Sequence, residues 1–192
     1  MVKSILLVGV GGQGTILTSK ILTLGLLEAG NDVKMNEIHG MSQRGGSVSS
    51  QIRYASAGEE VYSPVIEENS ADILVAFEKM EALRWLSWLK NDGLLVVNDC
   101  EIPPLAVLTG KFEYPKGIDA ELSKRTALMK VEASRYAVEL GNPKTMNMIL
   151  LGVIVKKMGL EAIDWAEIIR KNVKSDFVDI NIRALQEGLK MS

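Results

Sequence analysis

Two glycine-rich segments carry the residues whose types and spacing could do chemistry. The first is Gly9-Val10-Gly11-Gly12-Gln13-Gly14, which directly follows a short apolar run at residues 4–8. Apolar residues then recur at helical spacing over residues 15–29, and Gly30 suits the end of a helix. A strand, a G-x-G-x-x-G turn and a helix open a doubly wound α/β fold. Such a turn brings backbone N–H groups and a helix N-terminus up to an anion such as a phosphate.

A purely structural role for the same glycines is the alternative, because they also let a strand and a helix pack closely in a Rossmann-like core. Gln13 fits a ligand contact and a polar side chain at the start of the helix equally well. The candidate cofactor contacts in this segment are Gly9, Gly11, Gly12, Gln13 and Gly14.

The second glycine-rich segment follows Glu37, which lies 23 residues after Gly14. In a nucleotide-binding Rossmann domain an acidic residue near this place holds the ribose hydroxyls. The loop that follows contains His39 and the triplet Arg44-Gly45-Gly46. A guanidinium beside flexible backbone amides suits a phosphate or a carboxylate, so Arg44, Gly45 and Gly46 are further candidate cofactor contacts. An arginine that closes a surface turn, or one that docks a partner subunit, fits the same pattern.

The sequence indicates no catalytic residue and no metal site. No serine or cysteine stands in a nucleophile elbow, and a lone histidine such as His39 is more often structural than a general base. The single cysteine, Cys100, excludes an internal disulfide, a Cys-x-x-Cys pair and a self-contained iron–sulfur or cysteine zinc site. We expect Cys100 to be a small buried apolar side chain. Asn91-Asp92-Gly93 does not match the Gly-Asp-Gly motif of a thiamine diphosphate site.

Composition narrows the function further. The chain has 192 residues, of which 47% are hydrophobic, and a formal net charge of −2. Interspersed charges of both signs argue against a nucleic-acid surface and a basic membrane patch. The longest later apolar run, residues 148–155, is far shorter than a membrane span, and the N-terminal apolar run ends in a glycine turn rather than a cleavage-type sequence. We therefore expect a cytoplasmic protein that is soluble and binds neither nucleic acid nor membrane.

The elements that must position the two glycine-rich segments follow from hydrophobic periodicity. The fold class that we predict is α/β: a Rossmann-like three-layer sheet, mostly parallel with an antiparallel edge, plus C-terminal helices, in a single domain over residues 1–192. A helix at residues 15–29 should bury Leu17, Ile21, Leu24 and Leu27. The predicted extended segments are residues 4–8, 32–36, 47–54 (half-exposed, antiparallel and near a sheet edge), 61–64, 71–77, 94–98, 107–114 and 126–131.

The predicted later helices cover residues 79–89, 118–125, 132–140, 164–172 and 180–191, and Asp164 should cap the fourth of these. Residues 148–155 are apolar all round, which indicates a helix that is buried on every side or lies in an interface.

Taken together, the two glycine-rich segments resemble a known family. The run Glu37-Ile38-His39-Gly40-Met41-Ser42-Gln43-Arg44-Gly45-Gly46-Ser47, combined with the turn at residues 9–14, is similar to the gamma-type subunit or domain of 2-oxoacid:ferredoxin oxidoreductases. Within that family the sequence is most similar to the small subunit of the indolepyruvate type. The resemblance extends along the whole chain, and includes residues 61–64, 141–142 and 147–148.

The resemblance implies a subunit of a heteromeric enzyme that is inactive alone. The family oxidatively decarboxylates 2-oxoacids to acyl-coenzyme A and CO2 and passes electrons to ferredoxin. Thiamine diphosphate and iron–sulfur clusters reside on the larger alpha subunit, which agrees with the single cysteine here. The indolepyruvate type implies arylpyruvate substrates. The glycine turn and the loop Arg44-Gly45-Gly46 become candidate contacts for coenzyme A or substrate.

Two other functions fit parts of the sequence. A free-standing NAD(P)-dependent Rossmann oxidoreductase would explain the G-x-G-x-x-G turn and Glu37. The unusual loop after Glu37 argues against this alternative. A non-catalytic assembly module with a vestigial nucleotide fold is the other alternative, and it predicts that Arg44→Ala leaves turnover of the complex unchanged.

Overall fold

The computed structural model describes residues 1–40, 45–56 and 58–191. In this part of the chain six strands form one sheet in the order β2-β3-β1-β4-β5-β6. The strands are β1 (Lys3–Val10), β2 (Asp32–His39), β3 (Ser47–Ala55), β4 (Ala71–Ala76), β5 (Leu89–Asn98) and β6 (Leu128–Val131). Strands β1, β4, β5 and β6 pair in parallel, whereas β3 pairs antiparallel with both β1 and β2. The predicted α/β fold with a mostly parallel sheet and an antiparallel edge is confirmed.

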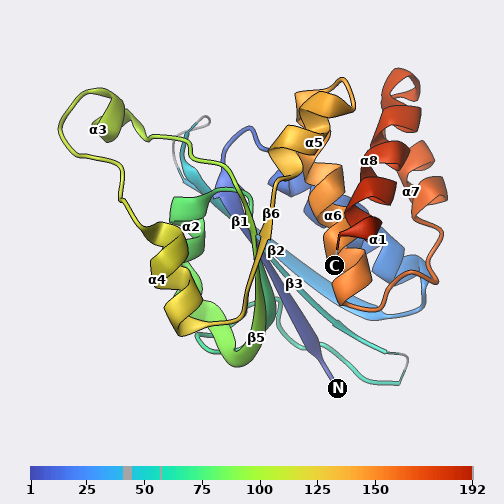
Figure 1. The fold of residues 1–192 in the computed structure, drawn as a ribbon. Helices are drawn as coiled ribbons and strands as arrows, with labels where there is room; N and C mark the ends of the chain where they lie inside the picture. Colours follow the sequence, from blue (N-terminus) through green and yellow to red (C-terminus); the bar gives the residue numbers. More distant parts are fainter. Residues whose placement is uncertain (41–44, 57, 192) are drawn as a thin grey trace.

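Helices cover both faces of this sheet (Figure 1). They are α1 (Thr15–Glu28), α2 (Lys79–Arg84), α3 (Leu105–Leu108), α4 (Ile118–Arg125), α5 (Ala133–Glu139), α6 (Met146–Lys157), α7 (Trp165–Asn172) and α8 (Val178–Lys190), with short 3-10 turns η1 (Leu86–Trp88), η2 (Pro143–Thr145) and η3 (Ser175–Phe177). Helices α1 and α5–α8 lie on one face, and α2 and α4 lie on the other (Figure 1). The alternation of strand side chains divides the core accordingly: Ile5 and Val75 pack on the α1 side, and Leu6 and Leu74 pack on the α2 side.

Helix α1 is rotated relative to the sequence prediction. Ile21 is fully buried as expected, but Leu27 is 48% exposed, and Leu17 and Leu24 are only partly buried. The buried face instead carries Leu22 and Leu26 and small residues between them. Four leucines at helical spacing were compatible with more than one face, and Trp165, which packs directly over Gly25, selects the face that is buried.

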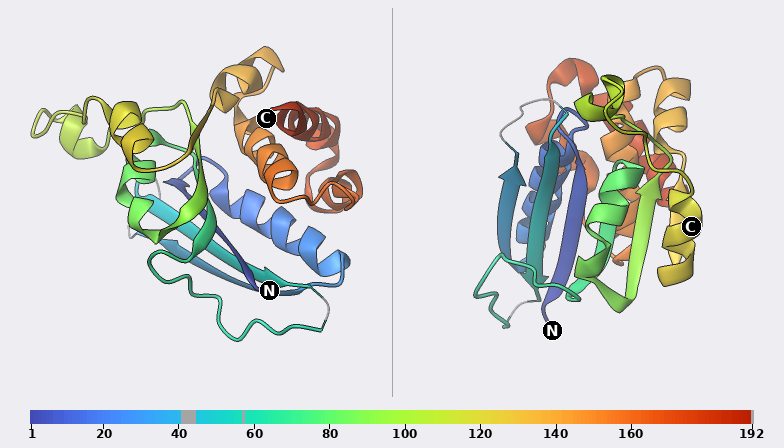
Figure 2. Two further views of the ribbon diagram at one scale, coloured as in Figure 1. Left: turned by 60° about the horizontal axis from the view of Figure 1, so that its bottom comes forward. Right: turned by 90° about the vertical axis from the view of Figure 1, so that its left-hand side faces the viewer.

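Strand β3 is not half-exposed, contrary to the alternation in its sequence. Seven of its nine residues are buried, because residues 58–70 run across the face that α1 does not cover (Figure 2). Gln51 Oε1 accepts a hydrogen bond from Ile66 N at 2.7 Å, and Arg53 Nη1 donates to Ser63 O at 3.0 Å. Polar side chains of β3 therefore bind a covering segment rather than water.

Two other element boundaries differ from the prediction. The helix expected over residues 79–89 ends at Arg84, and β5 begins at Leu89 and passes through Asn91-Asp92-Gly93 with a register shift against β4. Residues 107–114 were expected to be extended, but they contain no strand. Residues 107 and 108 belong to the short helix α3, which begins directly after Pro104. Proline is well placed there because its fixed φ and missing N–H suit a helix start.

The apolar helix after residue 145 is buried on all sides. Residues 146–155 of α6 are all buried, and α8 crosses them at close range because Gly152 and Gly188 face each other. Asp164 caps α7 as predicted, since its side chain accepts from Glu167 N at 3.0 Å. In the described residues no helix is long and apolar enough to cross a membrane.

Candidate functional site

The two glycine-rich segments meet at the end of the sheet where β1 and β2 finish. Gly11 N donates to Gly46 O at 2.9 Å, and Gly40 N donates to Ser47 O at 3.1 Å. The described residues of the second segment therefore lie at the end of β2 and the start of β3, and Gly46 lies against the turn between β1 and α1. Arg44 lies outside the described residues. The structure thus brings most of the predicted contacts together at one place.

The glycines of the turn differ in their surroundings. A Cβ on Gly9 would lie 2.9 Å from Phe77 Cβ, so Gly9 serves close packing. Gly12 has φ of +102° and open space where a Cβ would be, and Gly45 is similar with φ of +78°. Gly14 has φ of +83°, and its Cβ would lie 2.6 Å from Asn147 Nδ2. Gly12 is therefore the glycine of the turn that combines a left-handed backbone with an open side.

Gln13 holds the turn together through both ends of its amide. Val10 N donates to Gln13 Oε1 at 2.7 Å, and Gln13 Nε2 donates to Phe77 O at 2.9 Å. The side chain therefore ties the end of β1 to the segment that follows β4. The sequence did not predict these two hydrogen bonds, because nothing in it shows that residue 77 lies beside residue 13.

The N-terminus of α1 is free to meet an anion. Gly14 is its N-cap, no side chain caps it, and no acidic residue stands in its first turn. No acceptor among the described residues takes the N–H of Gly12 or Gly14. Unpaired N–H groups at the positive end of a fourteen-residue helix favour a phosphate or a carboxylate.

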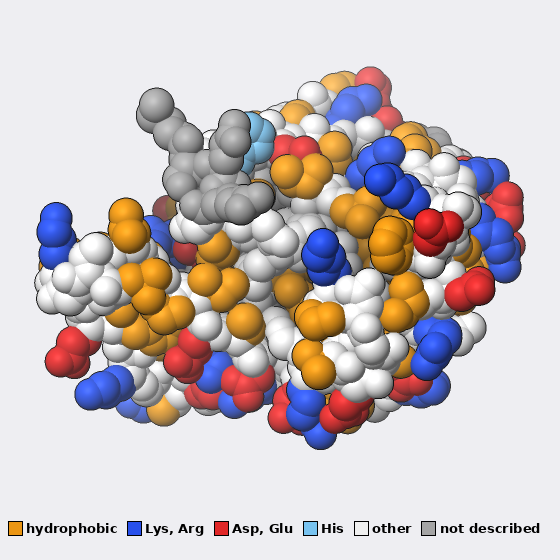
Figure 3. All heavy atoms as spheres, turned by 90° about the horizontal axis from the view of Figure 1, so that it is seen from above, with side chains coloured by type: hydrophobic (Ala, Val, Ile, Leu, Met, Phe, Trp, Pro, Cys, Tyr) orange, Lys and Arg blue, Asp and Glu red, His pale blue; other side chains and the backbone are white. Residues whose placement is uncertain are grey.

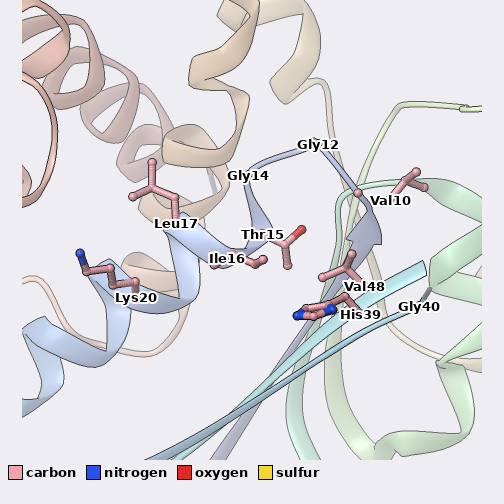
Figure 4. Close-up of a pocket in the computed structure, with 11 residues that line it drawn as sticks. Val10, Gly12, Gly14, Thr15, Ile16, Leu17, Lys20, His39, Gly40 and Val48 are labelled. Carbon is pink, nitrogen blue, oxygen red and sulfur yellow. The ribbon is translucent and has the colours of Figure 1, made fainter. Parts of the chain in front are cut away.

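Hollows lie on both sides of the turn. The turn pocket, of about 610 Å³, is lined by Val10, Gly11, Gly12, Gly14, Thr15, Ile16, Leu17, Lys20, His39, Gly40 and Val48 (Figure 4). In it His39 and Val48 lie across from Thr15 (Figure 4). The Cys100 pocket, of about 440 Å³, is lined by Gly12, Gln13, Gly14, Leu17, Cys100, Ile102, Pro143, Lys144, Met146 and Asn147. Gly12 and Gly14 border both hollows, so a bound molecule can reach their amides from either side.

Three lining residues of these hollows, Thr15, Lys20 and Asn147, were not predicted from the sequence as ligand contacts, although residue 147 belongs to the resemblance. Thr15 Oγ1 and Asn147 Oδ1 are buried and have no hydrogen-bond partner. Lys20 forms no ion pair with the described residues and places a cation one helical turn after Ile16 on the same face. The helical spacing of Lys20 could have been found from the sequence, whereas Asn147 comes from a helix far along the chain.

Glu37 is not placed to hold a ribose beside the turn. Strand β3 lies between β1 and β2, so the end of β2 is one strand further away than in a Rossmann nucleotide site. In addition, Ser19 Oγ donates to Glu37 Oε1 at 2.6 Å. The geometry therefore argues against the free-standing NAD(P)-dependent enzyme.

No acid–base pair or nucleophile is assembled in the described part of the site. His39 is exposed at the end of β2 and borders the turn pocket. Burial raises the pKa of the Cys100 thiol, which a hydrogen bond from Ser134 only partly offsets, so Cys100 is not an activated nucleophile. Among the described residues no group of three or more metal-ligating side chains could hold a metal ion.

The chain compares with known proteins over almost its full length. The family described as pyruvate ferredoxin/flavodoxin oxidoreductase matches residues 4–191. The chain belongs to this family. It is 36% identical over 195 residues to the indolepyruvate oxidoreductase subunit IorB of Pyrococcus horikoshii, covering 97% of this chain and 94% of the relative.

Two solved structures share the fold. The gamma subunit of a keto/oxoacid ferredoxin oxidoreductase from Geobacter sulfurreducens aligns with a TM-score of 0.69 and 22% identity, covering 98% of this chain and 97% of that one. A 2-oxoglutarate:ferredoxin oxidoreductase from Magnetococcus marinus, with 2-oxoglutarate, coenzyme A and succinyl-CoA bound, aligns with a TM-score of 0.75 and 19% identity. The alignment covers 99% of this chain but 31% of that one. In that relative the fold is thus one part of a longer chain.

Proposed function

We propose that this chain is the small, gamma-type subunit of an indolepyruvate-type 2-oxoacid:ferredoxin oxidoreductase and that its glycine turn holds the phosphates of coenzyme A. The main observation behind this proposal is the hydrogen bond from Gly11 N to Gly46 O, which joins both glycine-rich segments beside the uncapped start of α1. The name of the Pyrococcus relative and the coenzyme A in the Magnetococcus structure support the proposal.

The residues of this chain fit the phosphate part of coenzyme A. The N–H groups of Gly12 and Gly14 and the first turn of α1 supply donors without a competing acceptor among the described residues. Lys20 and Lys144 border the two hollows and add positive charge. Coenzyme A supplies the thiol that accepts the acyl group, and this chain binds and orients it. In this proposal Gln13 keeps the turn in shape, and Arg44 contacts a phosphate or a carboxylate.

The oxidative chemistry is assigned to a larger alpha subunit. We propose that thiamine diphosphate and iron–sulfur clusters reside there, that ferredoxin receives its electrons, and that the complex decarboxylates arylpyruvates in the cytoplasm. The single cysteine of this chain supports the assignment, as does the lack of a metal-ligating group in the part of the chain that is described. In this view residues 1–192 form a single domain.

An exposed apolar patch offers a place for the larger subunit. Leu105, Leu108 and Phe112 are each at least 70% exposed, and we call them the α3 patch. The segment that carries them projects from the body of the fold (Figure 1), and hydrophobic side chains gather over it (Figure 3). Apolar groups gathered on a projecting segment are typical of a protein–protein contact.

Recovery of the complex tests the assignment. A tagged copy of this chain, purified without oxygen from its native source, should bring with it a larger subunit with iron–sulfur absorbance and bound thiamine diphosphate. The recovered complex should reduce ferredoxin with an arylpyruvate and coenzyme A. Repeated recovery of this chain alone would overturn the subunit assignment.

Substitution of Arg44 separates a ligand role from an assembly role. We expect Arg44→Ala to lower turnover of the complex while both subunits still elute together, and Arg170→Ala, an exposed arginine on α7, to change neither. Dissociation of the complex would assign Arg44 to docking. Unchanged turnover in an intact complex would favour the non-catalytic assembly module.

A further inference from the structure

A buried carboxylate on α2, that of Glu81, holds the start of β3. Ser47 Oγ donates to Glu81 Oε2, and the Glu81 side chain is only 3% exposed. Ser47 directly follows Gly46, whose carbonyl oxygen accepts from Gly11 N at 2.9 Å. Glu81 therefore grips the place where the second glycine-rich segment joins the sheet, although no residue of α2 lines the turn pocket.

Helix capping does not account for the burial of Glu81. Helix α7 has the same spacing of residues, with an acidic N-cap, Asp164, a glutamate three residues later and an arginine three residues after that. In both helices the N–H of this glutamate donates to the N-cap carboxylate at 3.0 Å, and its side chain pairs with the arginine. On α7 the glutamate, Glu167, is 45% exposed. A capped helix start therefore requires no buried glutamate, and the hydrogen bond from Ser47 is what distinguishes Glu81.

A second buried carboxylate, that of Glu78, fixes the position of α2. The residue is fully buried, and its two carboxylate oxygens have different partners. Oε2 accepts from Glu81 N at 3.0 Å, whereas Oε1 accepts from Ile102 N at 3.2 Å and from the Tyr114 hydroxyl. Taking a carboxylate out of water is costly unless well-placed hydrogen bonds compensate for the lost solvation. These bonds leave the first turn of α2, and with it Glu81, little freedom to shift.

The hydrogen bonds continue from Glu81 to the glycine turn. Ser47 is the first residue of β3 and pairs with Val10, the last residue of β1. Its neighbour Gly46 accepts from Gly11 N on the other side of the same junction. Strand ends open locally at a lower free energy than the core of a sheet does. An anchor at Ser47 therefore determines how firmly Gly46 is held beside the turn.

We propose that Glu81 is a positioning residue, which holds Ser47 and through Ser47 fixes Gly46 against the glycine turn. Glu81 itself contacts no ligand. The consequence for coenzyme A rests on the proposed function, because Gly45 and Gly46 are among the proposed contacts. Loosening this segment weakens binding of coenzyme A and leaves the later chemical steps unchanged.

Amide hydrogen exchange in the free full-length chain tests the positioning without any ligand. Ser47→Ala removes the hydroxyl that donates to Glu81, and we expect exchange of the Gly11 N–H to become about tenfold faster. Ser47→Thr keeps a hydroxyl and should restore the wild-type rate. Glu167→Gln, at the matched surface position on α7, should leave the rate unchanged. An unchanged Gly11 rate in Ser47→Ala would overturn the inference.

The amides of α6 distinguish a local effect from a general loss of stability. Their exchange should be the same in wild type and in each of these variants, because α6 lies on the other face of the sheet (Figure 1). Equal acceleration of Gly11 and of α6 in Ser47→Ala would overturn the positioning role.

A double-mutant cycle assigns the effect to the pair of Ser47 and Glu81. Both Ser47→Ala and Glu81→Ala remove the same hydrogen bond, so the double variant should accelerate Gly11 exchange no more than Glu81→Ala does alone. Accelerations that multiply in the double variant would show that the two residues act separately, and would overturn the inference.

Kinetics of the complex separate this inference from the proposed function. In Ser47→Ala we expect the KM for coenzyme A to rise about fivefold, with kcat and the KM for the 2-oxoacid unchanged. A lower kcat at an unchanged KM would overturn the positioning role. If Gly11 exchange accelerates while the KM for coenzyme A stays constant, the positioning by Glu81 is supported and the proposed coenzyme A contact is overturned.

Discussion

Gly12 and Gly14 both adopt left-handed backbone conformations, but only Gly14 is crowded. A Cβ on Gly14 would press on Asn147, whereas a Cβ on Gly12 would enter open space between the turn pocket and the Cys100 pocket. The same substitution at the two positions should therefore have different consequences. We expect Gly14→Ala to strain the backbone and to disturb the packing against Asn147. We expect Gly12→Ala to strain the backbone and to weaken ligand binding.

Gly12→Ala should weaken coenzyme A use more than it weakens the fold. We expect a loss of about 1–2 kcal/mol in the free energy of unfolding from backbone strain. In the complex we expect a KM for coenzyme A raised about tenfold, with a KM for the 2-oxoacid that is unchanged. Gly159→Ala is the matched control, because Gly159 has φ of +68° and open space but lies far along the chain after α6. If Gly12→Ala and Gly159→Ala have the same KM for coenzyme A, a ligand role for Gly12 is contradicted.

The contact between α6 and α8 depends on two glycines that the sequence did not single out. A Cβ on Gly188 would overlap the carbonyl oxygen of Ile149, and one on Gly152 would overlap that of Leu185. Because these are backbone atoms of the opposite helix, the clash cannot be relieved by rotation of a side chain. The apolar run predicted α6 itself, but only the packing of α6 against α8 explains why each of these helices contains a glycine.

Gly188→Ala should therefore destabilise the chain, although alanine is the better helix former by about 1 kcal/mol. We expect a net loss of about 3 kcal/mol or more in the free energy of unfolding by urea, since the helices must separate. Gln186→Ala, an exposed position on the same helix, should leave it nearly unchanged. A stabilised Gly188→Ala variant would show that α8 does not pack this closely.

The elements that the sequence predicted are those with strong local periodicity, and the errors have non-local causes. Strands β1 and β4, helix α1 and the capped start of α7 lie where expected. The exposure of β3 depended on residues 58–70, and the start of β5 was hidden by the turn-type residues Asn91-Asp92-Gly93. At the site, the motif predicted the turn. The hydrogen bond from Gln13 to Phe77 and the contact of Asn147 with Gly14 join residues that are far apart in the sequence, so only the structure shows them.

An ion network joins the ends of β4 and β5 to α4. Lys79 Nζ lies 2.7 Å from Asp99 Oδ1 and 3.1 Å from Glu101 Oε1, and Lys130 Nζ lies 2.8 Å from Asp119 Oδ2. The hydrogen bond to Asp99 raises the pKa of Lys79 and holds the pKa of Asp99 below its usual range. Lys79 is mostly buried, so its charge is weakly screened.

Lys79→Met should cost about 2 kcal/mol in the free energy of unfolding at pH 7. The lowered pKa of Asp99 means that its stabilisation is present above about pH 3.9 and is lost as the pH falls through the lower folded value. The difference between wild type and variant in urea titrations should therefore shrink from pH 7 to pH 3. Lys116→Met removes an exposed ion pair with Glu113 and should leave the free energy of unfolding unchanged at both pH values. A difference that is constant down to pH 3 would contradict the charge argument.

At the scale of the whole molecule, the segment of residues 102–114, which carries the α3 patch, is anchored by hydrogen bonds at both ends and exposes its apolar side chains between them. Glu78 is fully buried and accepts from the Tyr114 hydroxyl and, at 3.2 Å, from Ile102 N. Both residues flank the segment that carries the α3 patch. A segment that is anchored by a buried carboxylate and exposes Leu105, Leu108 and Phe112 is organised to present them to another surface.

The double variant Leu105→Asp and Phe112→Asp should therefore weaken association with the larger subunit. Carboxylates in an apolar contact lose solvation on binding, and we expect the dissociation constant to rise about tenfold or more. The free chain should melt at an unchanged temperature, because neither side chain packs on the core. Val65→Asp, at another exposed apolar side chain, is the matched control in the same binding measurement. If the double variant binds the larger subunit as tightly as this control does, the partner covers a different face, and the α3 patch has another occupant.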